Sequence, residues 1–250
     1  DATEQRSAAP PPTTPEIFWR EGDDKQAYQQ LDYQTHSLAL NQRQGRAARL
    51  IDGVRKPPLG LPPLTGSSHI TAEAIELGRR LFYDRRLSLN ATFSCAMCHI
   101  PEQGFTSHEM ATAVGVEGRS VRRNSPTLYN VAYAELLFHD GRERSLEQQV
   151  WGPLLAENEM ANPSIGVVVD KINAIADYRQ RFRHVFGQPA NMLTIGQALA
   201  SYQRSLNSAD SAFDRWYYGH QTQAMTPAAQ RGFGLFTGKA GCQQCHLLGE

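Results

Sequence analysis

All four cysteines of this 250-residue chain lie in two copies of one short motif, Cys-x-x-Cys-His. Two thiols separated by two residues and followed at once by histidine form the attachment pattern of a c-type haem. In such a site the thiols form thioethers to the haem, and the adjacent histidine ligates the iron. We therefore predict two covalently bound c-type haems. The predicted residues are Cys95, Cys98 and His99 for the first haem and Cys242, Cys245 and His246 for the second.

The same cysteine spacing has other uses, which the sequence weakens but does not remove. A Cys-x-x-Cys pair also occurs in thioredoxin-like redox sites and as half of a zinc site. A zinc ion held by both pairs together is left open by the spacing alone. The histidine after each pair and the lack of a fifth cysteine favour haem attachment. Because haem is normally attached covalently outside the cytoplasm, we expect a periplasmic location.

The charge balance excludes some classes of partner. Lys plus Arg equal Asp plus Glu at 25 each, so the formal net charge is zero. This balance gives no indication of a nucleic acid or an anionic membrane as partner. No apolar run is long enough to span a bilayer. The chain opens on Asp1 without an initiator Met, and we interpret it as a processed or trimmed product.

The chain divides into a proline-rich N-terminal extension, residues 1–64, and two haem domains. Prolines cluster at 10–12, 57–58 and 62–63, and the first of these clusters is expected to be extended. The stretch from 27 to 50 is compatible with either a helix or a wrapping arm. Because the two motifs lie far apart, we predict one domain each, 65–165 and 166–250.

The apolar pattern predicts a mainly α fold with long loops. Thr71 is a suitable N-cap for a helix that runs through Phe82. Thr226 followed by Pro227 predicts the start of a helix that delivers the second motif. Further helices are predicted over Ser145–Val150, Val167–Phe186 and Thr194–Leu206. Strand signals are few.

From Leu77 to its end the chain resembles the bacterial dihaem cytochrome c peroxidase and MauG family. The matching blocks are residues 77–88, 123–130, 138–142, 211–215 and 231–236. The resemblance implies two cytochrome c-like domains, a peroxide-reacting first haem, an electron-relay second haem and a calcium ion between them. Asn124 matches a family calcium-binding position. The alternative for Asn124 is a side chain that stabilises the turn before Ser-Pro.

The resemblance also implies a distal pocket for peroxide. Gln149, Pro153, Glu159 and Met160 have the spacing that the family uses there. Glu159 would be the acid–base residue that moves a proton between the peroxide oxygens. Gln149 would help to orient peroxide. The alternatives are that Glu159 is a solvated acid and that Gln149 is a solvated helix position.

Two positions depart from the family pattern. Many members carry a distal histidine on the first iron, and here Val116 stands at that place, which predicts an open, five-coordinate haem. His108 is nearby, but its spacing does not match, and it is expected to be an exposed loop residue. His139 replaces a tryptophan between the haems and is harder to oxidise. Trp151 and Trp216 are candidate substitutes, although buried aromatic residues more often form core.

The second haem lacks an identified sixth ligand in the sequence. In the family this ligand comes from further downstream, and the chain stops four residues after His246. The second domain is therefore expected to be incomplete at its C-terminus. Met225 is close in sequence, but core packing explains it better.

The resulting hypothesis is a periplasmic dihaem enzyme. It would reduce hydrogen peroxide with electrons from a small redox protein, a cytochrome c or a cupredoxin. One alternative is a MauG-like enzyme that uses a ferryl haem to oxidise Tyr or Trp side chains of a partner protein. A second alternative is a dihaem electron-transfer cytochrome without a catalytic step, which would have no need of a distal acid such as Glu159.

Overall fold

The computed structural model describes residues 47–64 and 70–248, and this part of the chain is mainly helical, as predicted. The longer helices are α3 (Ala47–Arg55), α4 (Ala72–Tyr83), α7 (Ile165–Ala174), α8 (Ala176–Phe186), α9 (Met192–Arg204) and α11 (Pro227–Thr237). The shorter ones are α5 (Leu146–Gln149), α6 (Trp151–Leu155) and α10 (Ala212–Tyr217). Within the described ranges β-pairing is limited to isolated bridges such as Ile100 with Thr106.

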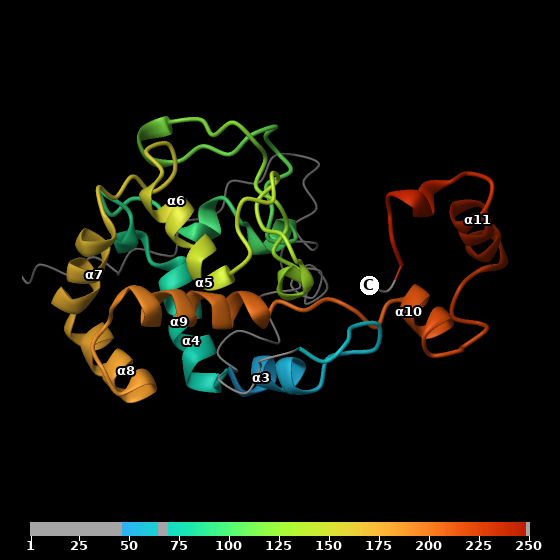
Figure 1. The fold of residues 1–250 in the computed structure, drawn as a ribbon, viewed down its shortest axis with the longest axis horizontal. Helices are drawn as coiled ribbons and strands as arrows, with labels where there is room; N and C mark the ends of the chain where they lie inside the picture. The colour runs from blue at the N-terminus through green and yellow to red at the C-terminus, as the bar shows by residue number, and fades with distance from the viewer. Residues whose placement is uncertain (1–46, 65–69, 249–250) are drawn as a thin grey trace, which may run out of the picture.

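Helices α4 and α9 form the centre of the larger body, where α9 lies across α4 (Figure 1). Gly78 on α4 makes this close approach possible. A Cβ atom at Gly78 would lie 1.8 Å from the backbone oxygen of Ala198 on α9. The side chains of Leu81 and Phe82 on α4 are buried. The Phe82 ring lies 6.5 Å from the ring of His99 in the first motif.

The predicted helix starts at Thr71 and Thr226 are confirmed. The Thr71 hydroxyl accepts a hydrogen bond from the amide of Ala74, and the Thr226 hydroxyl accepts one from the amide of Ala229. Each side chain therefore satisfies one of the free amides of a first helical turn. Pro227 occupies the first position of α11, where a missing N–H costs nothing.

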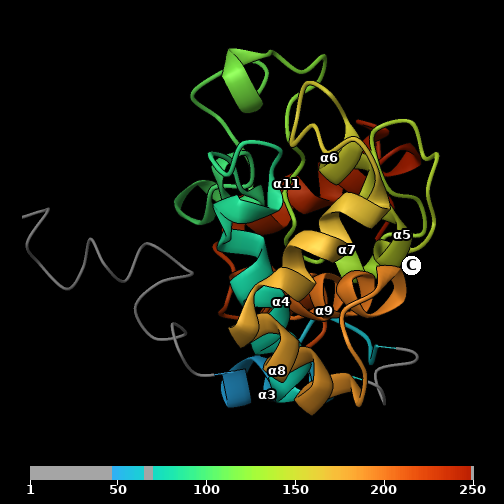
Figure 2. The same cartoon turned by 90° about the vertical axis from the view of Figure 1, so that its left-hand side faces the viewer.

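The predicted helical pattern over Val167–Phe186 is confirmed except at Ile175, where the structure divides it into two helices. Ile175 lies between α7 and α8 with extended backbone angles, φ −84° and ψ 114°. Val168 and Ile172 are buried on α7, and Tyr178 and Phe182 are buried on α8. Figure 2 shows that the two helices run in different directions. The apolar spacing continues across the break, so the periodicity did not reveal it.

Two findings bear on the predicted domain limits without testing the division itself. Leu50, Ile51 and Val54 of α3 are buried against the main core, although α3 lies within the expected extension. Helices α7 to α9, on the C-terminal side of the expected boundary, pack in the same core as α4. Residues 1–46 of the predicted extension lie outside the described residues.

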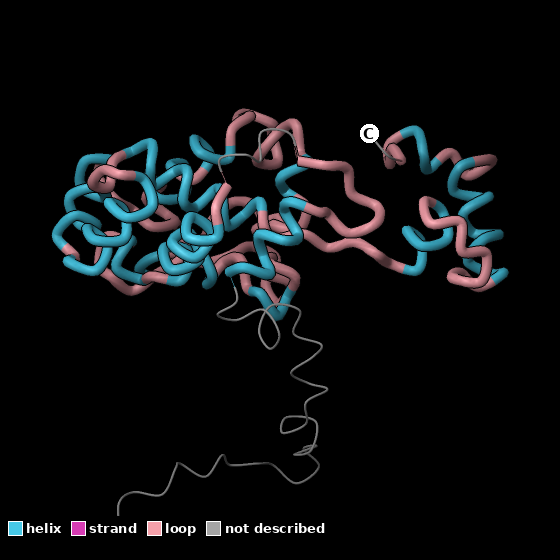
Figure 3. The backbone as a smooth tube through the Cα atoms, turned by 90° about the horizontal axis from the view of Figure 1, so that it is seen from below, coloured by secondary structure: helices cyan, strands magenta, loops and turns pink. Residues whose placement is uncertain are grey.

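Helices α10 and α11 lie beside the larger body and carry the second motif (Figures 1 and 3). The amide of Asp210 donates to the carbonyl of Leu59 where the two connecting segments meet, at 2.9 Å. Phe213 stacks on Tyr217, and Trp216 packs edge-on against Phe233 at 5.2 Å. Trp216 is thus part of an aromatic cluster. None of the described helices is long and apolar enough to cross a membrane.

Candidate functional site

The first motif forms one tight turn that places its side chains together. Residues 95–97 are a short 3-10 helix, and the amides of Cys98 and His99 both donate to the carbonyl of Cys95. The imidazole of His99 donates from Nδ1 to the carbonyl oxygen of Phe105 at 2.9 Å. A carbonyl can only accept, so the proton is on Nδ1 and Nε2 keeps its lone pair. This is the arrangement that orients a histidine ligand toward a metal.

The electrostatic surroundings keep these side chains neutral. Burial raises the pKa of the Cys95 thiol to about 12 and that of the Cys98 thiol to about 11, and the nearby carboxyl of Glu159 adds to both shifts. Burial also lowers the pKa of His99, which favours the neutral imidazole that binds metal.

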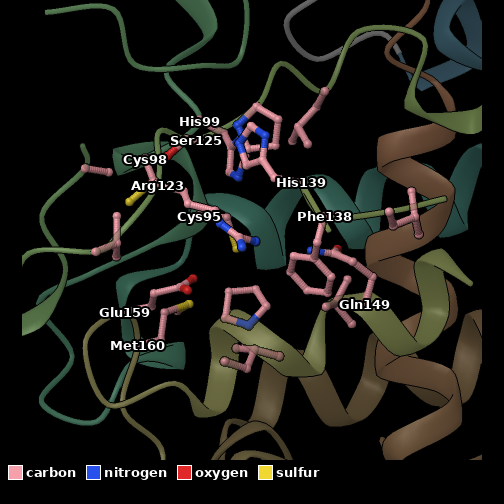
Figure 4. A pocket seen from close by; sticks show the side chains of 18 of the residues that line it. Cys95, Cys98, His99, Arg123, Ser125, Phe138, His139, Gln149, Glu159 and Met160 are labelled. Atoms are coloured by element: carbon pink, nitrogen blue, oxygen red, sulfur yellow. The ribbon is translucent and has the colours of Figure 1, made fainter. Parts of the chain in front are cut away.

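A cavity of about 630 Å³ opens in front of the first motif. Its walls include the thiols and imidazole of the motif and, from α5, α6 and the turn after them, Gln149, Pro153, Glu159 and Met160. Figure 4 shows Glu159 and Met160 pointing into the same space as Cys95 and Cys98. The structure thus brings the four predicted distal-pocket residues and the first motif into one cavity.

Glu159 is the half-buried acid of this cavity. Burial raises the pKa of its carboxyl, and the Arg142 guanidinium partly opposes that shift. Among the described residues no group donates a hydrogen bond to the Glu159 carboxyl, so its oxygens are free to meet a ligand in the cavity. A raised pKa makes the carboxyl a stronger base, and a positioned carboxyl can accept a proton and return it.

Gln149 is held in the cavity wall by the packing of α5 on α9. Glu147 forms an ion pair with Arg204 of α9, with a distance of 3.0 Å between Nη2 and Oε2. Gly196 of α9 allows this contact, because a Cβ atom there would lie 2.5 Å from the Glu147 carbonyl. The amide of Gln149 donates to the carbonyl of Ser145, which fixes the end of α5.

Val116 and His139, the two positions that depart from the family pattern, lie in different parts of the structure. Val116 is 1% exposed in the core and does not line the cavity, while its amide donates to the carbonyl of Glu159 at 2.9 Å. The open coordination of the first haem stays a prediction. His108 is exposed, as expected. His139 lines the cavity and donates from Nε2 to the carbonyl of Asn124 at 2.9 Å.

Asn124 makes the contacts of a turn-stabilising residue. Its side-chain amide donates to the carbonyls of Ser107, Met110 and Ala111 at 2.8 to 3.2 Å. Its side-chain oxygen accepts from the Thr106 hydroxyl. These bonds join the loop after the first motif to the segment before Pro126. A calcium ion at Asn124 stays a proposal.

Arg142 is a cavity residue to which the sequence gave no role. Its guanidinium lies over the Phe138 ring, 3.5 Å from the ring centroid, and donates to Asp140 at 2.7 Å. Hydrogen bonds from Arg123 and Arg142 lower the pKa of Asp140 to about 2. Arg142 lies in the matched block 138–142, but its influence on Glu159, 17 positions later, arises only in the folded chain.

The second motif repeats the turn of the first. The amides of Cys245 and His246 both donate to the carbonyl of Cys242, and the His246 ring lies 6.1 Å from that of Phe236. In the first motif the corresponding distance, from His99 to Phe82, is 6.5 Å with a similar tilt. The cysteines and histidine of the second motif are exposed, and Met225 is half-buried.

Comparison with known proteins agrees with this geometry. Methylamine utilization protein MauG of Methylorubrum extorquens is 40% identical over 186 residues, which are 74% of this chain and 52% of that protein. Cytochrome c551 peroxidase of Nitrosomonas europaea is 34% identical over 188 residues, 74% of this chain and 55% of that protein. The chain thus spans about half the length of the curated relatives it matches.

Solved structures give the same result. The crystal structure of a MauG-like protein associated with microbial copper homeostasis has a TM-score of 0.68 and 33% identity, covering 77% of this chain and 57% of that one. The crystal structure of the dihaem peroxidase BthA from Burkholderia thailandensis has a TM-score of 0.62 and 29% identity. The match covers 70% of this chain and 49% of that one. The sequence matches the model of the di-haem cytochrome c peroxidase family over residues 72–222, and the chain belongs to that family.

Proposed function

We propose that the protein is a periplasmic dihaem peroxidase that reduces hydrogen peroxide with electrons from a small redox protein. The observation that carries the proposal is the carboxyl of Glu159 in the same cavity as the first Cys-x-x-Cys-His motif. Membership of the di-haem family implies two haems. Covalent attachment at both motifs, a relay role for the second haem and a calcium ion at Asn124 are parts of the same proposal.

The first cavity fits a haem by its residues. Cys95 and Cys98 are on one turn, and His99 has its Nδ1 proton engaged and its Nε2 lone pair available. The cavity volume of about 630 Å³ lies in the range of cofactor sites. When bound, the haem supplies an iron centre that accepts a peroxide oxygen and stores oxidising equivalents.

The protein's own residues then carry the proton chemistry. Cleavage of the peroxide O–O bond with loss of water needs a proton on the departing oxygen. The Glu159 carboxyl can take the proton from one peroxide oxygen and return it to the other. The Gln149 amide can orient peroxide by hydrogen bonding, and Pro153 and Met160 contribute apolar side chains to the same cavity wall. His139 is a polar cavity neighbour rather than an aromatic bridge.

A second candidate function is oxidation of Tyr or Trp side chains in a partner protein. The 40% identity to a protein named MauG favours it, as does Val116 at the position of the family's distal histidine. Both functions use the same cavity and the same acid. They differ in what supplies the electrons, a dedicated donor protein or the partner's own side chains.

Peroxide-dependent oxidation of reduced cytochrome c tests the proposed function. The holoprotein is expected to oxidise the donor continuously while peroxide lasts, and a cupredoxin serves as the second donor. Donor oxidation no faster than in a mixture of peroxide and donor alone would contradict the peroxidase function. Modified Tyr or Trp side chains in a co-incubated protein, without donor oxidation, would support the second candidate instead.

Covalent attachment has its own test. Because both motifs form the same turn with a free pair of cysteines, we expect acid–acetone extraction to leave the haem absorbance on the denatured protein, with two irons per chain. Extraction of the colour into acetone, or a single iron per chain, would contradict this prediction. Iron analysis and the absorbance of the denatured protein measure it.

A further inference from the structure

The position of Glu159 depends on the backbone of a tight turn after α6. The amide of Met160 donates to the carbonyl of Pro153 at 3.1 Å, and the amide of Ala161 donates to that of Ala156 at 2.9 Å. Ala161 has φ +57°, a left-handed conformation that a non-glycine residue adopts only when its surroundings impose it. Among the described residues, no hydrogen bond holds the Glu159 carboxyl directly. Its position therefore depends on the contacts that fix the backbone of this turn.

Asn162 fixes the end of the turn from inside the protein. It is 2% exposed, and its side-chain amide donates to the carbonyls of Leu154 and Leu87 at 2.8 and 2.7 Å. Its side-chain oxygen accepts from the ammonium group of Lys171 at 2.9 Å. One buried side chain thus joins α6, the segment after α4, and α7.

Lys171 of α7 completes the arrangement with neutral partners only. Its ammonium group donates to the carbonyls of Ser88 and Leu89, at 2.7 and 3.3 Å, and to the Asn162 side chain. Within the described part of the chain it takes part in no ion pair. Three acceptors around a group with three N–H donors satisfy it fully, which explains why a partly buried cation is placed there.

The segment that Lys171 holds reaches both sides of the cavity. The amide of Leu89 donates to the carbonyl of Met160 at 2.9 Å, which ties the segment to the Glu159 turn. The Ser88 hydroxyl accepts from the amide of Phe93 at 3.0 Å, and Phe93 lines the cavity two residues before Cys95. The acid and the first attachment motif are therefore linked through the same few hydrogen bonds.

We propose that Lys171 and Asn162 are positioning residues that set the place of the Glu159 carboxyl relative to the first attachment motif. Neither residue lines the cavity, so neither touches peroxide. The inference rests on the proposed role of Glu159. A catalytic group displaced by about 1 Å can cost about 10²-fold in rate, so a change in this link has a measurable effect.

The test is a double-mutant cycle on the reaction of the oxidised holoprotein with peroxide. Lys171→Met keeps most of the side-chain length and removes the three donors. It is expected to slow the reaction by about 10- to 100-fold when Glu159 is present and to have no further effect in Glu159→Gln. Equal slowing in both backgrounds would show a general structural role and overturn the proposal.

A chemical rescue separates positioning from simple damage. In the holoprotein the native cysteines are blocked by haem, so Lys171→Cys provides a single free thiol. Alkylation of that thiol with bromoethylamine rebuilds a lysine-like side chain and is expected to restore the peroxide rate. The exposed Lys56→Met is the matched control and is expected to react at the wild-type rate. Rescue that restores nothing overturns the proposal.

A readout without peroxide completes the design. In Lys171→Met the amide of Leu89, which donates to Met160, is expected to exchange with solvent faster than in the wild type, while amides at the centre of α9 keep their protection. Unchanged exchange at the Leu89 amide would contradict the proposed link.

If Lys171→Met does not take up haem, Asn162→Asp takes its place in the cycle. Aspartate has the size of asparagine and can still accept from Lys171, but it cannot donate to the carbonyls of Leu87 and Leu154.

The outcomes also separate this inference from the proposed function. If Glu159→Gln reacts with peroxide as fast as the wild type, the role of Glu159 fails, whatever Lys171→Met does. If Glu159→Gln is slow but Lys171→Met reacts at the wild-type rate, the proposed function stands and only the positioning role is overturned.

Discussion

Glu159→Gln is expected to slow the reaction with peroxide by about 10²–10⁴-fold, the range typical of a positioned acid–base group. The substitution keeps the shape of the side chain and removes the titrating oxygen. It leaves the turns of both motifs untouched, so haem content and the spectrum of the oxidised protein should stay close to the wild type.

The environment of Glu159 explains the size of this effect. The carboxyl is half-buried, and burial raises its pKa above the ordinary value of a glutamic acid, which makes it easier to protonate. The positive charge of Arg142 partly opposes that rise in pKa. Apolar residues such as Phe93, Leu154 and Met160 also line the cavity, and a positioned carboxyl is a better proton carrier there than disordered water.

Rapid mixing of the oxidised holoprotein with peroxide measures the Glu159→Gln effect through the change in haem absorbance. The exposed Glu135→Gln, which does not line the cavity, is the matched control and should react normally. Gln149→Ala should be slowed less, because it orients peroxide without carrying the proton. If Glu159→Gln reacts at the wild-type rate, the acid is elsewhere, and His139 in the same cavity becomes the candidate.

Gly78→Ala is expected to destabilise the protein by about 1–3 kcal/mol or more, the cost of forcing an extra methyl group into a packed interface. The new Cβ atom would lie 1.8 Å from the Ala198 carbonyl oxygen and 2.6 Å from its carbon. These are backbone atoms of α9, so no side-chain rotation relieves the contact. The two helices must move apart, which disturbs Phe82 beside His99.

The sign of the Gly78 effect is informative, because helix propensity alone predicts the opposite. Alanine is favoured over glycine within a helix by about 1 kcal/mol. Gly53→Ala on α3 is the matched control, since nothing lies within 4 Å of its Cβ position. Thermal unfolding should show a lower midpoint for Gly78→Ala and an equal or higher one for Gly53→Ala. A raised midpoint for Gly78→Ala would show that α4 and α9 are not packed as described.

Features set by neighbouring residues could be predicted from the sequence. Thr71 and Thr226 cap helices because a hydroxyl reaches an amide three residues later, and this depends on local geometry alone. The turn of each motif is similarly local. The break at Ile175 could not be predicted, because its apolar neighbours continue the helical spacing and only packing on the core separates α7 from α8.

In the candidate site too, some residues could be predicted from the sequence and others only from the structure. The motif residues follow from their spacing, and the resemblance to a family selected Glu159 from many acids. The contacts of Lys171 and Asn162 had no local signal, since Lys171 meets Ser88 and Leu89 more than 80 positions earlier in the chain. Arg142 likewise affects Glu159 only through the fold. The supporting contacts of a site depend on tertiary structure more than its reacting groups do.

The central claim is that peroxide reacts in the cavity of the first motif and not at the second. The most direct measurement mixes peroxide with two oxidised variants, each lacking one attachment site. Cys95→Ser with Cys98→Ser removes the first site, and Cys242→Ser with Cys245→Ser removes the second. The account predicts a rapid change of haem absorbance in the variant that keeps the first site and none in the other. A rapid reaction in the variant that keeps only the second site would contradict it.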